Sequence, residues 1–173
     1  YEQPKAVADT LNPRIKDDQI VIEELGMSDE DIRAIQKIFI VACGSASYTG
    51  MTAKYIFEGM ARIPVEVDVA SEFRYRDPIL TPETLVIVVS QSGETADTLA
   101  ALRLAKSQGS RVLGIVNVVG SSIAREADNV LYTWAGPEIS VATTKAYSSQ
   151  LAAFYLLSIK FAQVRGVIDD AQV

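Results

Sequence analysis

Buried-strand patterns and helix patterns alternate along most of this chain. Five short apolar runs, rich in β-branched residues, are typical of strands buried on both faces of a parallel sheet. These runs are Lys37–Cys43, Val65–Ala70, Thr84–Val89, Arg111–Asn117 and Asn129–Tyr132. Helical spacings occupy about 45–61, 95–107, 121–126 and 143–165. The alternation predicts an α/β fold, a three-layer doubly wound sandwich around a five-stranded parallel sheet.

The residues before the first of these strands show weaker patterns. Residues 1–36 look like a connector followed by short helices, the first of which Pro4 opens. Ser28 is expected to cap a helix that runs to about Gln36, with Asp31 three residues later as in a capping box. We therefore expect the main domain to cover 37–165.

The strand over Thr84–Val89 runs directly into a polar, glycine-containing turn. Ser90, Gln91, Ser92 and Thr95 supply three hydroxyls and one amide where a helix begins. The first N–H groups of a helix have no intrahelical partner, so the turn is predicted to bind an anion such as phosphate. No Lys or Arg lies in it, so dipoles and hydrogen bonds would meet the charge. A plain N-cap explains the same local pattern, but the end of a central strand favours a ligand site.

A second strand–polar turn–helix unit follows the first strand. Its turn contains Ser45 and Ser47, which taken alone are better explained as helix caps than as a ligand wall. In a doubly wound sheet both serine turns come to one edge, where they can face a common crevice.

Two other segments leave alternatives open. Phe73 and Tyr75 lie beside two arginines and form either a solvated edge or a subunit contact. Lys145 lies in the first turn of the helix over 143–165, where a cation opposes the helix dipole. We expect a solvated lysine there, with a ligand contact as the alternative. The helix itself is apolar on most faces, which predicts burial against another domain or subunit.

Composition narrows the chemistry. The chain has 173 residues, 49% of them hydrophobic, and no apolar run long enough to span a bilayer. It has no histidine and no recognisable metal or cofactor motif, and its net charge of −6 argues against nucleic acid. The single cysteine, Cys43, fits a reducing, cytoplasmic compartment. No signal peptide is visible in these residues, and a first residue of Tyr1 leads us to expect a fragment or a processed chain.

The stretch Ser90–Thr98 (SQSGETADT) resembles the signature of the sugar isomerase (SIS) domain family, and more narrowly the isomerase part of the glutamine–fructose-6-phosphate aminotransferases. Four other stretches agree in the expected order. They are Tyr1–Pro4 (YEQP), Ala42–Gly44 (ACG), Ala70–Arg76 (ASEFRYR) and Glu138–Ala146 (EISVATTKA). The resemblance implies a flavodoxin-like fold and a site for a phosphosugar, with no cofactor. Fructose 6-phosphate, glucose 6-phosphate and glucosamine 6-phosphate are the implied ligands.

The resemblance also implies which residues hold that ligand. The positions that match the family's phosphate contacts are Ser90, Gln91, Ser92 and Thr95. Ser45 matches a sugar contact from the first turn, and Val141 matches one from the loop before the last helix. Ala46 stands where the family usually has a serine, with Ser47 one place later. Either Ser45 and Ser47 share the sugar contact, or the hydrogen bonding to the sugar differs here.

Enzymes of the resembled family carry a glutaminase domain, two SIS domains and a C-terminal tail. This chain resembles the first SIS domain, with 166–173 as the start of a linker to the second. The family's glutamate base, ring-opening histidine and Schiff-base lysine lie in the second SIS domain or the tail. No catalytic residue is therefore expected here, and a homodimer is the expected assembly.

Three functions remain open from the sequence. The first is the phosphosugar-binding half of an enzyme that converts fructose 6-phosphate and glutamine to glucosamine 6-phosphate and glutamate. The second is a phosphosugar-sensing SIS module of a transcription regulator, which needs a DNA-binding segment that 1–36 does not suggest. The third is an architectural role, in which the helix over 143–165 holds subunits together.

Overall fold

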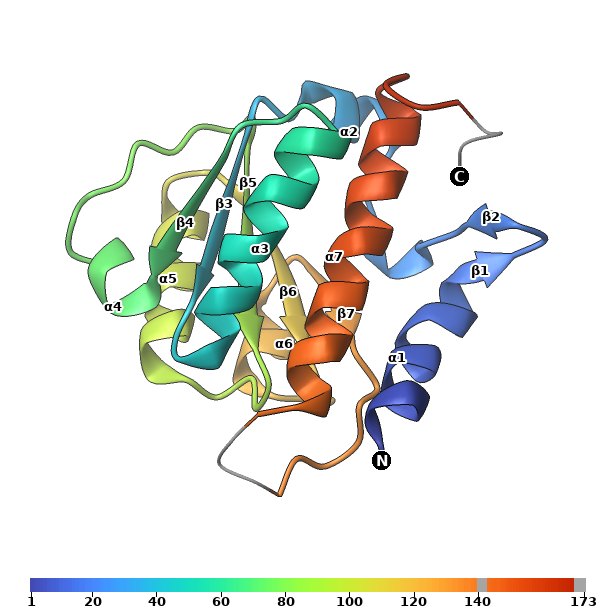
Figure 1. The fold of residues 1–173 in the computed structure, drawn as a ribbon. Helices are drawn as coiled ribbons and strands as arrows, with labels where there is room; N and C mark the ends of the chain where they lie inside the picture. Colours follow the sequence, from blue (N-terminus) through green and yellow to red (C-terminus); the bar gives the residue numbers. More distant parts are fainter. Residues whose placement is uncertain (140–142, 170–173) are drawn as a thin grey trace.

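The computed structural model describes residues 1–139 and 143–169. Within these residues, a parallel sheet is built from β3 (Lys37–Ala42), β4 (Val65–Val69), β5 (Thr84–Ser90), β6 (Arg111–Val116) and β7 (Asn129–Tyr132). Its strand order is β4-β3-β5-β6-β7 (Figure 1). The chain thus starts inside the sheet, adds one edge strand, and then builds out the other side. The predicted doubly wound sandwich is confirmed.

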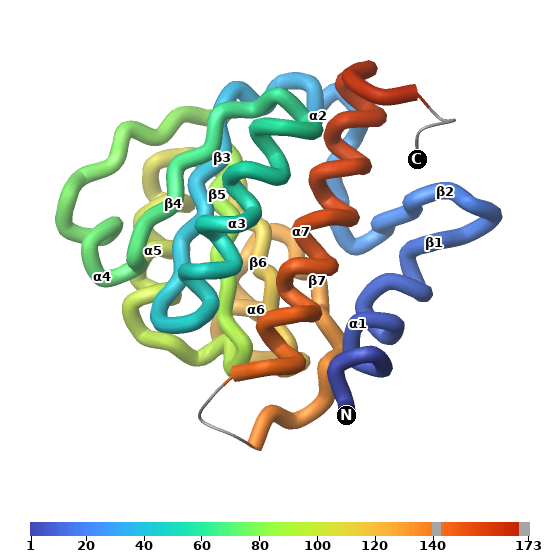
Figure 2. Tube along the Cα trace, viewed as in Figure 1, coloured from blue at the N-terminus to red at the C-terminus, as the bar shows by residue number. Residues whose placement is uncertain are grey.

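Helices cover both faces of the sheet (Figures 1 and 2). One face carries α3 (Ser45–Met60) and α7 (Lys145–Val164), and the other carries α4 (Ala70–Phe73), α5 (Ala96–Ser107) and α6 (Ser122–Glu126). The split follows the two-residue period of a strand. Leu85, Ile87 and Val89 of β5 join the core under α3 and α7, whereas Val86 and Val88 pack with α5.

The N-terminal residues pack against the α7 side of the sandwich. The elements there are α1 (Gln3–Leu11), η1 (Asn12–Arg14), β1 (Ile15–Lys16), β2 (Gln19–Ile20), η2 (Glu23–Leu25) and α2 (Asp29–Ala34). Helix α1 lies along α7 (Figure 1). The buried Arg14 guanidinium donates to the carbonyl oxygen of Tyr132 at 2.8 Å and to Glu24 Oε1 at 2.7 Å. Thr10 Oγ1 donates to the carbonyl oxygen of Thr133. These bonds fix the N-terminal segment to the end of β7.

The expected capping box is present at the start of α2. Ser28 Oγ accepts from the N–H of Asp31 at 3.1 Å, and Asp31 Oδ2 accepts from the N–H of Ser28 at 3.0 Å. The helix ends at Ala34, earlier than its pattern predicts, because Gln36 already joins the strand layer. Its N–H donates to the carbonyl oxygen of Glu83 at 2.9 Å, just ahead of β5.

Helix α7 buries much of its apolar surface against other elements of this chain. Phe57 of α3 meets Phe154 and Phe161 of α7 edge to face, with ring centroids 6.3 and 5.7 Å apart. Helix α1 covers a further side of α7. Tyr155 remains 47% exposed, on the side facing α3. Among the helices of the described ranges, none is long and apolar enough to cross a membrane.

The segment after β4 differs from its expected role. Phe73 is wholly buried, and its ring meets Phe39 of β3 edge to face at 5.6 Å. The prediction of a solvated edge or a subunit contact is therefore wrong for Phe73. Between β4 and β5 the chain crosses the sheet face beside α5, and Phe73 covers the part that α5 leaves open. Tyr75 is 78% exposed and lies against the Arg74 guanidinium.

Replacing these two aromatic residues separates the core role from the surface role. Phe73→Ala is expected to lower the free energy of unfolding by about 3–5 kcal/mol, because it leaves a cavity beside Phe39. Tyr75→Ala, the neighbouring control, is expected to change it by less than about 0.5 kcal/mol. Urea denaturation of both variants measures the difference. Equal losses would contradict the assignment of Phe73 to the core.

Candidate functional site

Two polar turns meet at the carboxyl edge of the sheet, at the bottom of Figure 1. Strands β3 and β5 are neighbours, with Ala42 beside Val89 at their ends. Strand β3 leads through Gly44 into α3, and β5 leads through residues 91–95 into α5. These two helices lie on opposite faces, so the turns flank the point where the strand order reverses. Open α/β sheets bind ligands at such a point.

In the turn after β5, hydroxyl groups bond to the backbone of the same turn. Ser90 Oγ accepts from the N–H of Gly93 at 3.0 Å and lies 3.1 Å from Thr95 Oγ1. Ser92 Oγ accepts from the N–H of Glu94 at 3.2 Å. Thr95 stands at the N-cap position of α5, yet its side chain makes no capping hydrogen bond to the helix. A plain N-cap therefore does not explain the turn.

The turn after β3 places its two serines differently. Gly44 has a φ of +58°, and α3 begins directly after it. Ser45 is exposed to solvent. Ser47 is buried, and its Oγ donates to the carbonyl oxygen of Gly44 at 2.6 Å. The structure thus brings Ser45 and Ser47 to the same sheet edge as the turn after β5, but the Ser47 hydroxyl bonds within its own turn. Val141 lies outside the described residues.

The turn after β5 also rests on the turn after β6, which the sequence analysis missed. The N–H of Asn117 donates to the carbonyl oxygen of Gln91 at 3.3 Å, and the N–H of Ile123 donates to that of Gly93 at 2.9 Å. Gly93 has a φ of +68°, and a Cβ atom there would lie 2.0 Å from Ser121 Oγ. Gly93 was the one sign of this contact in the sequence, because only glycine accepts both this φ and this close approach.

The carboxylate in this turn is bound at the N-terminus of α6. Glu94 Oε1 accepts from the N–H of Ser122 at 2.7 Å. Hydrogen bonds from the hydroxyl and the backbone of Ser122 hold the pKa of Glu94 below its usual value. Glu94 is therefore ionised at neutral pH and already engaged, which fits the view that it is not a proton-transfer group.

Lys145 is not the solvated side chain that its position suggested. It is 5% exposed, and its Nζ lies 3.0 Å from Glu2 Oε2. The carboxylate of Glu138 accepts from the N–H of Ala146 at 3.4 Å, in the same helix turn. The expectation fails because the partner, Glu2, lies 143 positions away in the sequence and on a different element.

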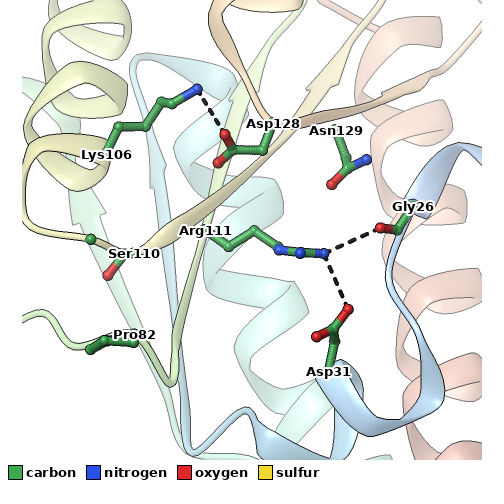
Figure 3. Close-up of a pocket in the computed structure, with 9 residues that line it drawn as sticks. Gly26, Asp31, Pro82, Lys106, Ser110, Arg111, Asp128 and Asn129 are labelled. Carbon is green, nitrogen blue, oxygen red and sulfur yellow. Dashed lines mark hydrogen bonds and ion pairs between the residues drawn. The ribbon is translucent and has the colours of Figure 1, made fainter.

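A polar groove of about 600 Å³ lies at the opposite, amino edge of the sheet (Figure 3). Lys106 Nζ lies 2.7 Å from Asp128 Oδ1, and Arg111 Nη1 lies 3.6 Å from Asp31 Oδ2 and 3.2 Å from the carbonyl oxygen of Gly26. Both cations are thus paired with carboxylates, so the groove has no net positive charge to attract an anion.

No group of three or more potential metal-ligating side chains occurs in residues 1–139 and 143–169. Apart from the Glu94 carboxylate, which is bound to the N–H of Ser122, the polar groups of the two turns are hydroxyls, an amide and backbone N–H groups. Such donors suit a phosphate or a sugar better than a metal ion.

The model of one protein family, described as the SIS domain, matches residues 31–160. The chain belongs to the SIS domain family. It is 60% identical over its whole length to glutamine–fructose-6-phosphate aminotransferase [isomerizing] of Caldanaerobacter subterraneus subsp. tengcongensis. It is 59% identical to the protein of the same name from Clostridium acetobutylicum. The chain spans 29% of each of these curated relatives.

This SIS domain also resembles a solved structure. The C-terminal domain of glucosamine-fructose-6-phosphate aminotransferase from Francisella tularensis is 42% identical to it, with a TM-score of 0.93. The similarity covers 99% of this chain and 48% of that chain. Both serine turns lie inside the region matched by the family model.

The close approach of Gly93 to Ser121 predicts a measurable difference between two glycines. Gly120 has a similar φ of +72°, but nothing lies within 4 Å of a Cβ atom built there. Gly120→Ala is expected to cost about 1–2 kcal/mol for the left-handed backbone alone. Gly93→Ala is expected to cost at least about 1 kcal/mol more, because Ser121 must move. Chemical denaturation of the two variants tests this, and equal costs would contradict the contact.

Proposed function

We propose that this SIS domain binds a phosphosugar as one part of a glutamine–fructose-6-phosphate aminotransferase [isomerizing]. That enzyme would make glucosamine 6-phosphate and glutamate from fructose 6-phosphate and glutamine, in amino-sugar synthesis. The observation that carries the proposal is the 60% identity, over the whole chain, to a relative of that name. The hydroxyl-rich turn at the switch point of the sheet gives it a physical basis.

The phosphate would bind to Ser90, Gln91, Ser92 and Thr95. A hydroxyl donates one hydrogen bond and accepts two. Ser92 Oγ accepts from Glu94, so its proton can point to a phosphate oxygen. Ser90 and Thr95 share one hydrogen bond, so one of their two protons can also reach the ligand. The Gln91 amide and the first N–H groups of α5 would add further donors.

The sugar would lie toward the turn after β3. Ser45, exposed at the start of α3, can both donate to and accept from a sugar hydroxyl. The Ser47 proton already goes to Gly44, so Ser47 would contact the sugar as an acceptor. Val141 would contribute an apolar wall, as the family resemblance implies. Ser45 and Ser47 together would replace the serine that the family carries at Ala46.

The remaining chemistry would lie elsewhere in the whole protein. We propose that a glutaminase domain and a second SIS domain accompany 37–165, with 1–36 as connector and 166–173 as the start of a linker. These domains would supply the catalytic residues, so the chain alone would bind a sugar phosphate and turn nothing over. A net charge of −6 supports a small-molecule partner rather than nucleic acid. The lone Cys43 fits the cytoplasm.

We propose that two copies of the chain associate through the surface between α3 and α7. An apolar groove of about 490 Å³ lies there. Its lining residues are Met51, Thr52, Tyr55, Ile56, Met60 and Tyr155. Tyr55 is 75% exposed and Met51 is 47% exposed. The groove lining carries no charged side chain, so the patch does not repel its own copy across a two-fold axis.

Ligand titration tests the phosphosugar proposal. Fructose 6-phosphate, glucose 6-phosphate, glucosamine 6-phosphate and inorganic phosphate are each added to the chain and to Ser92→Ala, and the melting temperature is recorded. At about 100 times its dissociation constant a ligand stabilises the fold by about 2.7 kcal/mol. That corresponds to about 5–10 °C for a chain of this size. We expect this shift in the parent chain and its loss in Ser92→Ala.

Ser107→Ala is the control, because Ser107 lies at the far end of α5 and bonds only to its own helix, donating to the carbonyl oxygen of Leu104 at 2.8 Å. It should keep the full ligand shift. No shift with any sugar phosphate, or an unchanged shift in Ser92→Ala, would contradict the proposed site.

Sedimentation velocity tests the association. The chain is expected to sediment as a dimer at about 100 µM, in the range where interfaces of modest area associate. Tyr55→Ser combined with Tyr155→Ser should give a folded monomer, whose melting temperature is lower only by the stabilisation that association gives the parent chain. Tyr75→Ser, which removes a similarly exposed ring on the α4 side of the sheet, should remain dimeric. A monomeric parent chain would contradict the proposal.

A further inference from the structure

Glu94 lies inside the turn to which the anion-binding role is assigned. A carboxylate there is unfavourable for binding phosphate, since two negative charges about 5 Å apart repel even in a polar environment. In the structure the Glu94 side chain points toward α6. Glu94 Oε1 accepts the N–H of Ser122 at 2.7 Å, so the negative charge lies at the positive end of α6.

That bond belongs to a set of contacts between two turns. The N–H of Asn117 bonds to Gln91 at 3.3 Å, and the N–H of Ile123 bonds to Gly93 at 2.9 Å. In these two contacts the acceptors are backbone oxygens of the turn after β5. In the third contact, from the N–H of Ser122, the acceptor is the Glu94 side chain. The three bonds reach three of four consecutive residues, 91, 93 and 94. The Gln91 carbonyl is directed toward Asn117, just after β6, and the Gly93 carbonyl toward Ile123 of α6. The N–H groups of the same two peptides therefore face the other way.

We infer that Glu94 is a positioning residue, which orients the donors of the 90–95 turn by binding the first N–H of α6 and holds its own charge away from the phosphate. The inference rests on the proposed phosphosugar site and deepens it. Glu94 does not touch the ligand in this assignment. Ser92 is the group affected most directly, because its Oγ accepts from the N–H of Glu94 at 3.2 Å.

A competing explanation makes Glu94 a plain surface residue that stabilises α6. The geometry of Glu126 offers a matched comparison, because it also ties α6 to its surroundings. Its two carboxylate oxygens accept from Arg103 of α5, each at 2.7 Å. It lies at the other end of α6, however, and it makes no recorded contact with residues 90–95.

Three variants of the chain separate the two explanations: Glu94→Ala, Glu94→Gln and Glu126→Ala. Affinities for fructose 6-phosphate and for inorganic phosphate are measured by calorimetry. Glu94→Ala should weaken both about tenfold, because the donors of the turn lose their orientation. Glu94→Gln should stay within about threefold of the parent chain, since its amide oxygen can still accept from Ser122. Glu126→Ala should bind as the parent chain does.

Unchanged or tighter binding by Glu94→Ala would overturn the inference, because it would mean that the carboxylate only repels the ligand or plays no part. Weakening of Glu94→Gln to the level of Glu94→Ala would overturn it too, since the hydrogen bond would then not be the cause. Weaker binding by Glu126→Ala would also overturn it, because the loss of affinity would then follow from the general stability of α6.

A second readout does not depend on ligand. In an NMR titration the amide proton of Ser122 should follow the ionisation of Glu94, and this dependence should vanish in Glu94→Gln. If the parent chain binds neither phosphate compound, the proposed function fails while this titration still reports the Glu94–Ser122 bond. If binding is found and the Ser122 amide does not titrate, the inference about Glu94 fails and the proposed function stands.

Discussion

The pairing of β3 with β5 is the constraint on which the rest of the structure depends. These strands are the first and third of the sheet in chain order, and they run side by side from Lys37 beside Thr84 to Ala42 beside Val89. The helices that follow must then leave toward opposite faces, because a right-handed crossover toward each side of the sheet allows nothing else. The two turns lie at this edge and lead to helices on opposite faces, and Ser45 remains exposed there. Both serine turns owe their position to this pairing.

Within that frame, the turn after β5 is stabilised by neighbours rather than by its own sequence. Ordering this turn costs conformational entropy, most of all at Gly93, because glycine has the most backbone freedom to lose. Backbone bonds to the turn after β6 and the seat of Gly93 on Ser121 compensate for this. A turn held from outside keeps its donors in place before a ligand arrives, which lowers the entropy lost on binding.

The sequence predicted the features that depend on neighbouring residues alone. The β-branched runs predicted each strand of the five-stranded sheet to within a residue, and Ser28 with Asp31 predicted a capping box that needs no distant partner. The errors concern side chains whose partners are remote. Phe73 looked exposed because Phe39 cannot be inferred as its neighbour without the strand order. Lys145 looked solvated because its partner Glu2, just before α1, is remote in the sequence. The contacts between the two turns were missed for the same reason.

The turn after β5 contains no basic residue. An anion held there would be met by neutral O–H and N–H groups, whose attraction acts at contact distance and involves no exchange of counterions. Salt screens interactions between exposed charges over about 8 Å at physiological ionic strength, but it hardly weakens short hydrogen bonds. The domain would therefore keep its affinity across cells that differ widely in internal salt. It would also draw its ligand in by diffusion alone, without long-range electrostatic attraction.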